Sequence, residues 1–134
     1  MKYITTIKVR SYELDSYNHV NNAIYQNYLE YARMDYLEQI GFRYKDFFEA
    51  GYFLYVTHVD IKYKASARLG DTLTVESESV KIKTVQGTFH QTIKNQDGIV
   101  CVEADVDWAC VNSNGKPSKI PQEFLVKDLM PDQG

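Results

Sequence analysis

The chain has 134 residues, a length that suits one domain able to bury a hydrophobic core without disulfides or metal ions. Hydrophobic residues make up 44% and charged residues 25% of it, the usual mixture of a globular protein. A formal net charge of -3 does not provide the basic surface that binds nucleic acid, and no stretch approaches the roughly 20 apolar residues of a membrane span.

The N-terminal residues and the cysteines indicate the compartment. Residues 1–6 lack the apolar run of a signal peptide. Cys101 and Cys110 stand nine positions apart in one expected strand. That spacing places them on opposite faces, roughly 30 Å apart, too far to bridge. It also does not fit a metal site. We therefore expect one cytoplasmic domain over residues 1–134, with no metal, cofactor, nucleic-acid or membrane partner.

The first elements in chain order are a strand and a polar loop. Residues 3–12 alternate apolar and charged side chains, which predicts a strand. Residues 13–22 are rich in Asp, Asn and Ser and predict a loop that ends in a helix cap. Asn21 or Asn22 is expected to cap, because an Asn side chain accepts a hydrogen bond from the first turn.

A long helix is predicted from about Ala23 to Ile40. Apolar side chains recur there at helical spacing, and Gly41 stands where a helix commonly ends. Residues 44–50 predict a short second helix before Gly51.

Strand patterns follow the helices. Residues 58–65 alternate cleanly between apolar and polar side chains. The run 71–85 changes the parity of its apolar residues halfway, which indicates a bulge or a strong bend.

The last part of the chain predicts two further strands. A turn at residues 86–87 leads into a strand over 88–94, and the turn at 95–98 leads into a strand over 99–111. Residues 121–129 predict a short helix at the end.

This order predicts an α+β fold in which an antiparallel sheet of about five strands wraps around one long central helix. The outer face and the edges of such a sheet still need to be covered. We therefore expect a homodimer or a homotetramer.

The polar loop carries the residues best suited to chemistry. It places the carboxylate of Asp15 and the imidazole of His19 just before a helix N-terminus near Asn22. A helix start offers unpaired N–H groups that can stabilise an oxyanion, and a carboxylate nearby can attack a carbonyl or activate water. On the residue types alone, a helix cap and a solvated histidine are the more common explanation of this loop.

Two motifs add a family resemblance. The first combines an acidic pair, a polar run, and a patterned helix start: Glu13, Asp15, His19-Val20-Asn21-Asn22, Tyr25, Tyr28-Leu29-Glu30 and Ala32-Arg33. The second runs from Tyr63 to Asp71, with Ser66 where a proline is common. Together they resemble the 4-hydroxybenzoyl-CoA thioesterase family of hotdog proteins over roughly residues 3–125, so the resemblance implies a hotdog fold and an acyl-CoA thioesterase.

The resemblance also implies catalytic roles. The aspartate of the family falls on Asp15, as nucleophile or general base, and the N–H that polarises the thioester carbonyl falls near Asn22. His19 and Asn22 match a variant also seen in plant-type acyl-carrier-protein thioesterases. Those enzymes have an Asn where this chain has Tyr17.

Further residues are candidates for substrate binding. Some hotdog enzymes use a glutamate on the central helix, for which Glu30 is the candidate. We favour an ion pair between Glu30 and Arg33 instead, at i+3 on the helix. Tyr17 and Tyr25 flank the loop and are candidates to line an acyl pocket.

A small basic cluster is the candidate site for the CoA phosphates. Lys62, Lys64 and Arg68 form it at a strand end, the region that approaches these phosphates in the family. Such side chains bind phosphate well. Lysines on the exposed face of a strand explain the same pattern without a ligand.

The leading hypothesis is therefore cofactor-free hydrolysis of an acyl-CoA thioester to a free acid and CoA. The alternatives are an acyl-carrier-protein substrate, a hydratase or dehydratase acting on acyl thioesters, and a non-catalytic binder of acyl thioesters. The identity of the acyl group does not follow from the sequence.

Overall fold

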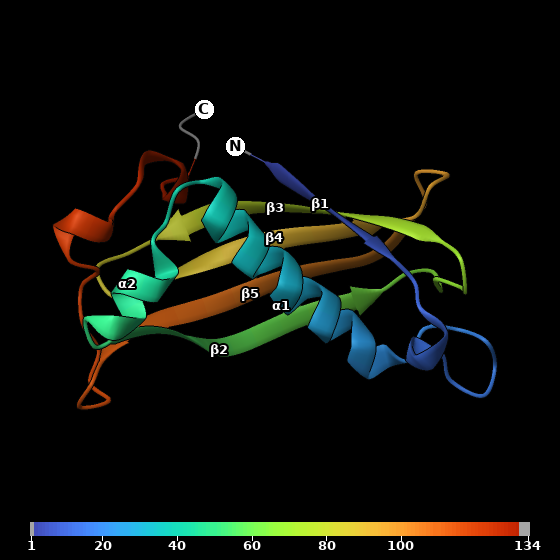
Figure 1. The fold of residues 1–134 in the computed structure, drawn as a ribbon, viewed down its shortest axis with the longest axis horizontal. Coiled ribbons are helices and arrows are strands. Elements are labelled where there is room, and N and C mark those ends of the chain that lie inside the picture. The colour runs from blue at the N-terminus through green and yellow to red at the C-terminus, as the bar shows by residue number, and fades with distance from the viewer. Residues whose placement is uncertain (1, 132–134) are drawn as a thin grey trace.

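The computed structural model describes residues 2–131 of the chain (Figure 1). A strand, two helices and four further strands follow one another: β1 (Tyr3–Lys8), α1 (Asn22–Gln39), α2 (Tyr44–Glu49), β2 (Tyr52–Tyr63), β3 (Thr72–Ile82), β4 (Gln86–Lys94) and β5 (Val100–Asn112). Short 3-10 turns lie at Ser11–Glu13, Gln122–Phe124 and Lys127–Leu129.

The strands form one five-stranded antiparallel sheet in the order β1-β3-β4-β5-β2. The α1 helix lies diagonally across one face of this sheet (Figure 1). The predicted α+β architecture, with a sheet wrapped around one long helix, is therefore confirmed. Since β1 and β2 end the strand order, β2 is an open edge along its full length.

The core lies between α1 and the inner face of the sheet. One stripe of α1 is buried, with side chains at the helical spacing that the sequence predicted: Tyr25, Tyr28, Leu29, Ala32, Tyr36 and Leu37. They pack against the inward side chains of the strands, among them the fully buried Val75, Ile93 and Val106. Burial of such a stripe is the main force that holds a helix on a sheet.

Several predicted boundaries were wrong, each for a local reason. The first strand ends at Lys8 instead of residue 12, because the chain then turns through a short 3-10 segment. The second strand begins at Tyr52, before the alternating stretch that marked it in the sequence. The final segment, 121–129, forms two 3-10 turns instead of a helix.

Gly87 lies inside β4, so the predicted turn at residues 86–87 was also wrong. A Cβ atom at Gly87 would stand 2.5 Å from Cζ2 of Trp108 and 2.6 Å from the carbonyl oxygen of Lys81. Glycine is therefore required there for close packing and not for a turn. The predicted irregularity in the strand before it is confirmed, because the β3–β4 register shifts between Ser79 and Lys81.

A buried carboxylate fixes the start of α1 to the end of β1. Glu13 is 4% exposed, and its Oε1 atom accepts hydrogen bonds from the Tyr28 hydroxyl at 2.7 Å and the Arg10 N–H at 2.8 Å. The Arg10 guanidinium donates to Oε2 at 2.7 Å. Burial alone would raise the pKa of Glu13, but the hydrogen bonds from Arg10 and Tyr28 outweigh it and lower that pKa.

This lowered pKa predicts a pH-dependent contribution to stability. A carboxyl group whose pKa is lower in the folded state stabilises the fold above its ordinary pKa and loses that contribution as the pH falls. We expect Glu13→Gln to reduce the free energy of unfolding by about 1–3 kcal/mol at neutral pH, and by less in acid. Urea unfolding at pH 7 and pH 4 measures both values. Glu49→Gln, at an exposed position of α2, is the control. If Glu13→Gln lost the same unfolding free energy at both pH values, the prediction would be contradicted.

Candidate active site

The polar loop between β1 and α1 folds back on itself. The Asp15 N–H donates to the His19 carbonyl oxygen at 2.7 Å, and Leu14 pairs with Val20 in an isolated antiparallel bridge. Asn18 has a φ of 62°, a left-handed conformation that Asn tolerates better than most residues. This tight turn brings the backbone of Asp15 and His19 side by side.

The carboxylate of Asp15 is half-buried and held by one of its oxygens. Oδ1 accepts the N–H groups of Tyr17 at 2.8 Å and His19 at 3.2 Å. Oδ2 takes no hydrogen bond from any residue between 2 and 131. One oxygen therefore orients the group in the loop, while the other is free to act on a substrate.

The N-terminus of α1 presents a free N–H close behind this loop. Asn21 is the cap, as predicted for one of the two asparagines, and its side chain accepts the Ala23 N–H at 3.0 Å. The Ile24 N–H donates to the Asn21 carbonyl oxygen at 2.9 Å. The N–H of Asn22 has no acceptor within the described part of the chain, so it remains available at the positive end of the helix.

The second sequence motif packs directly against the first. The Val20 N–H donates to the Ala67 carbonyl oxygen at 2.9 Å, and His19 pairs with Arg68 in an isolated bridge. The buried Tyr25 hydroxyl accepts the Ala67 N–H at 2.8 Å. The structure thus brings Arg68 next to His19, although 49 positions separate them in the sequence.

The two tyrosines near the loop lie in opposite environments. Tyr17 is 79% exposed, whereas Tyr25 is 3% exposed and belongs to the core. A third tyrosine, Tyr63, was not singled out as a site residue. Its hydroxyl donates to the Asn22 carbonyl oxygen at 3.4 Å and so reaches the helix start from the end of β2. Its only sequence signal was membership of the second motif.

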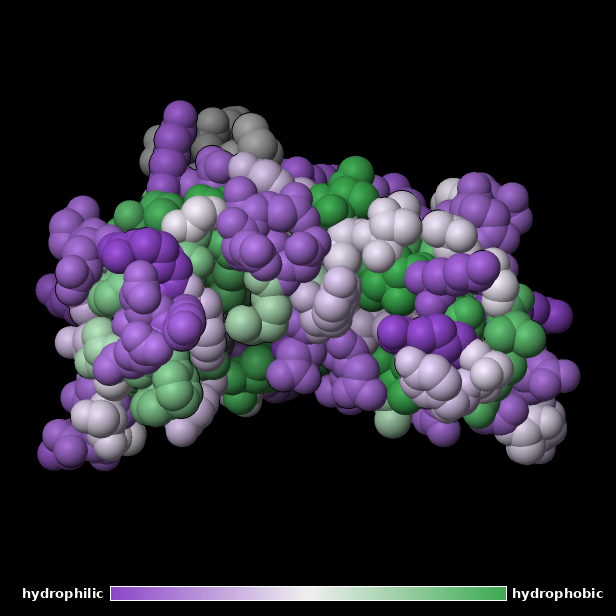
Figure 2. Space-filling model, viewed as in Figure 1, coloured by the Kyte–Doolittle hydropathy of each residue, from purple (hydrophilic) through white to green (hydrophobic). Residues whose placement is uncertain are grey.

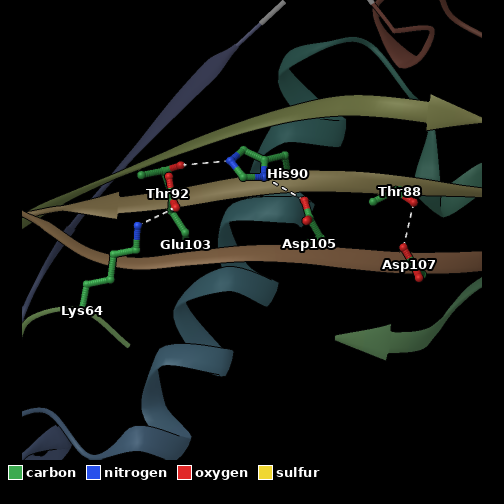
Figure 3. A network of polar contacts seen from close by, with 7 residues as sticks. All are labelled: Lys64, Thr88, His90, Thr92, Glu103, Asp105 and Asp107. Atoms are coloured by element: carbon green, nitrogen blue, oxygen red, sulfur yellow. Dashed lines mark hydrogen bonds and ion pairs between the residues drawn. The ribbon is translucent and has the colours of Figure 1, made fainter. Parts of the chain in front are cut away.

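The two lysines of the basic cluster lie on the outer face of the sheet. Lys64 makes an ion pair with Glu103 at 2.8 Å, and this hydrogen bond lowers the pKa of Glu103. Figure 3 shows this pair within a row of polar contacts along the strands, which includes His90 Nδ1 at 2.8 Å from Asp105 Oδ1. Lys62 stands opposite Glu103 in the β2–β5 register. Of the cluster, only Arg68 is shown in a backbone pairing with the loop.

A groove runs beside α1 on the side that faces β2. One cavity of about 310 Å³ begins at Gln26, one turn after Asn22, and a second of about 110 Å³ continues from it. Both are lined by Glu30, Arg33 and Val56, so we treat them as one space, the α1–β2 groove. Inward residues of β2 border it, because the diagonal α1 crosses this edge of the sheet only near the helix N-terminus and leaves the first part of β2 clear (Figure 1).

The predicted ion pair between Glu30 and Arg33 is not formed. The two charged groups do not come within 4 Å of each other. Arg33 instead donates through Nη1 to the side-chain oxygen of Gln91 at 3.2 Å. The spacing on the helix was suitable, but a partner on β4 fixes the guanidinium elsewhere.

Two further findings concern residues 2–131. No helix in this range is long and apolar enough to span a membrane. Within it, no group of three or more His, Cys, Asp or Glu side chains is placed to hold a metal ion. Cys101 and Cys110 are both buried and unbridged, as predicted.

Comparison with known sequences gives consistent relatives. Long-chain acyl-CoA thioesterase FadM of Escherichia coli K12 is 36% identical over 110 residues, which cover 81% of this chain and 82% of FadM. The chloroplastic acyl-acyl carrier protein thioesterase ATL2 of Arabidopsis thaliana is 30% identical over 118 residues. Those residues cover 86% of this chain but only 62% of ATL2, so the chain spans less than two thirds of that relative.

Solved structures show the same likeness. DHNA-CoA thioesterase from Staphylococcus aureus superposes with a TM-score of 0.86 at 25% identity, covering 92% of this chain and 83% of that one. The probable thioesterase YbaW from Escherichia coli gives a TM-score of 0.77 at 31% identity, covering 90% and 92%. The sequence model of the thioesterase-like superfamily matches residues 9–127. The chain therefore belongs to the thioesterase-like superfamily.

Proposed function

We propose that the protein hydrolyses acyl-CoA thioesters to a free acid and CoA. The observation that carries this proposal is the pairing of a carboxylate with one free oxygen, on Asp15, and an unbonded helix N–H, on Asn22, at the two ends of one tight loop. The names of relatives such as FadM support the same substrate class.

The chemistry uses both groups on one carbonyl. The thioester oxygen accepts the Asn22 N–H, where the helix dipole stabilises negative charge as the carbonyl carbon becomes tetrahedral. Asp15 Oδ2 either attacks that carbon, releasing CoA and leaving an anhydride that water hydrolyses, or removes a proton from the attacking water. Both routes end in the acid and the thiol of CoA. His19 holds the turn through its backbone, and we assign its ring the role of orienting the loop or the substrate.

Substrate binding would extend from this point in two directions. Arg68 lies beside His19 and is the best placed cation for the CoA phosphates, with Lys62 near the end of β2 and Lys64 just after it. The acyl group would enter the α1–β2 groove, which begins one helical turn past Asn22 and has Leu29, Val56 and Val59 among its lining residues. Tyr17, which is exposed, and Tyr25, which is buried, stay candidates for contacts with the acyl group near the loop.

A carrier-protein thioester is the second candidate substrate, and the name of the plant relative favours it. The acyl end would be recognised in the same groove, so the two candidates differ only in the carrier. Comparing kcat/KM for one acyl group on CoA and on acyl carrier protein separates them. A kcat/KM at least tenfold higher for the protein-bound thioester would make acyl carrier protein, and not CoA, the preferred carrier.

Asp15→Asn tests the catalytic assignment. Asn keeps an oxygen for the Tyr17 and His19 N–H groups, so the loop and the fold should remain, while the nucleophile or base is lost. We expect thiol release from acyl-CoA to slow by about 100- to 10,000-fold. Asp97→Asn, in an exposed turn, is the matched control and should behave as wild type. Wild-type turnover in Asp15→Asn would sink the assignment.

We further propose that the chain works in the cytoplasm as a homodimer or homotetramer, and the open edge of the sheet supports the oligomer. The β2 strand has a partner on one side only, and residues 55–58 at its middle are exposed. An unprotected edge of this length pairs readily with a second chain. We expect light scattering to give at least twice the 15.5 kDa of one chain. A single species of monomer mass at micromolar concentration would contradict this.

A further inference from the structure

Arg33 is a half-buried cation with no acidic partner in its own chain. No carboxylate among residues 2–131 lies within 4 Å of its guanidinium. Burial lowers the pKa of Arg33, and the nearby charge of Glu30 opposes this only in part. Removing a charge from water without pairing it costs free energy, so such a residue calls for an anionic partner.

The position of Arg33 is fixed from one side only. Gln91 is fully buried, and its amide nitrogen donates to the Leu29 carbonyl oxygen and to Ser77 Oγ, both at 3.0 Å. Its oxygen is thereby turned toward Arg33, which donates to it through Nη1. A guanidinium has five N–H donors. The remaining donors of Arg33 have no acceptor within the described residues, and the residue lines the α1–β2 groove.

Glu30 stands three positions earlier on the same side of α1 and is exposed. Like Arg33, it makes no ion pair with any described residue. The groove therefore presents one negative and one positive side chain next to each other, and neither is in an ion pair. Such a surface is complementary in charge to a copy of itself turned by a half rotation.

The open edge places both groups near the natural axis of that rotation. The β2 strand covers residues 52–63, so its midpoint falls between Thr57 and His58. Val56 and Val59, on either side of this midpoint, line the groove together with Glu30 and Arg33. A two-fold axis through the middle of β2 therefore passes close to the middle of α1. Such an axis would run two copies of α1 antiparallel, and a crossing between residues 30 and 33 would set residue 30 of one chain opposite residue 33 of the other.

We propose that Arg33 of each protomer forms an ion pair with Glu30 of the partner subunit across this axis, so that the pair occurs twice in the dimer. This inference rests on the oligomer advanced in the proposed function and names the contact that specifies it. Figure 2 shows the α1 face as a mixture of hydrophilic and hydrophobic residues and not as one apolar surface. A partner on this side must therefore satisfy charges as well as cover apolar groups.

Charge reversal tests the proposal. Glu30→Arg and Arg33→Glu each place like charges opposite each other twice per dimer. We expect the dimer dissociation constant to rise at least tenfold in both, by analytical ultracentrifugation. Glu38→Arg is the matched control, because Glu38 is exposed on α1 but lines a different cavity, beside α2, and should leave the constant within threefold of wild type.

Mixing the two variants separates a contact between chains from one within a chain. A Glu30→Arg chain facing an Arg33→Glu chain has opposite charges at both crossings, whereas an ion pair within one chain is not restored by mixing. With differently tagged chains, native mass spectrometry should show more heterodimer than random exchange gives. Random mixing of these chains, or single variants as tightly dimeric as Glu38→Arg, would overturn the proposal.

Two controls keep the outcome interpretable. If Arg33→Glu does not fold alone, co-expression with Glu30→Arg should recover it as a soluble heterodimer, and failure of that recovery also counts against the pair. A monomeric wild type would instead refute the oligomer itself. All of these experiments measure the oligomeric state, so their outcome does not depend on whether the protein hydrolyses thioesters.

Discussion

Glu13 ties together the three parts of the chain on which the site depends. Its side chain accepts hydrogen bonds from Arg10 at the end of β1 and from Tyr28 in the second turn of α1. Its own carbonyl oxygen accepts the N–H of Asn21, the cap of α1, at 3.0 Å. Both ends of the loop that carries Asp15 are therefore held by one residue. The loop can be short and polar because it does not have to position the helix.

Asp15 shows how a structural and a chemical role coexist in one group. A carboxylate has two oxygens, and the turn uses only Oδ1, to accept two N–H groups. The same hydrogen bonds that favour the turn also fix the orientation of the carboxylate. The simple interpretation of Asp15 as a turn-forming residue is thus compatible with its proposed role in catalysis. Its orientation is set before any substrate arrives, which is what a catalytic group requires.

The fold was predictable from the sequence where side-chain patterns are local. Alternation identified the strands over 99–111 and 71–85, including the irregularity near Ser79, and the apolar stripe identified α1 to within one residue at each end. The first half of β2 was missed because residues 52–57 are mostly aromatic and aliphatic and do not alternate. Gly87 was misread because its need for glycine comes from Trp108, a residue on the neighbouring strand.

The candidate site, too, was predictable only where its residues are close together in the sequence. The order Asp15, His19, Asn22 was visible because these residues share one loop. The pairing of that loop with Ala67 and Arg68, and the reach of Tyr63 to the helix start, depend on how the end of β2 returns past α1. A resemblance can indicate that two motifs belong together, but only the folded chain shows the hydrogen bonds that join them.

The α1 helix combines roles that constrain one another. Its buried stripe fills the core, its N-terminus supplies the N–H proposed to bind the thioester oxygen, and its β2 side carries the charges of the groove. A helix moves as a rigid rod, so a shift that improved packing at Tyr36 would also displace Asn22. Two side-chain hydrogen bonds limit such shifts, one from Tyr28 to Glu13 in the second turn and one from Arg33 to Gln91 near the middle of the helix. The polar contacts buried against α1 thus do more than stabilise the fold, because they also fix where the first turn of the helix lies.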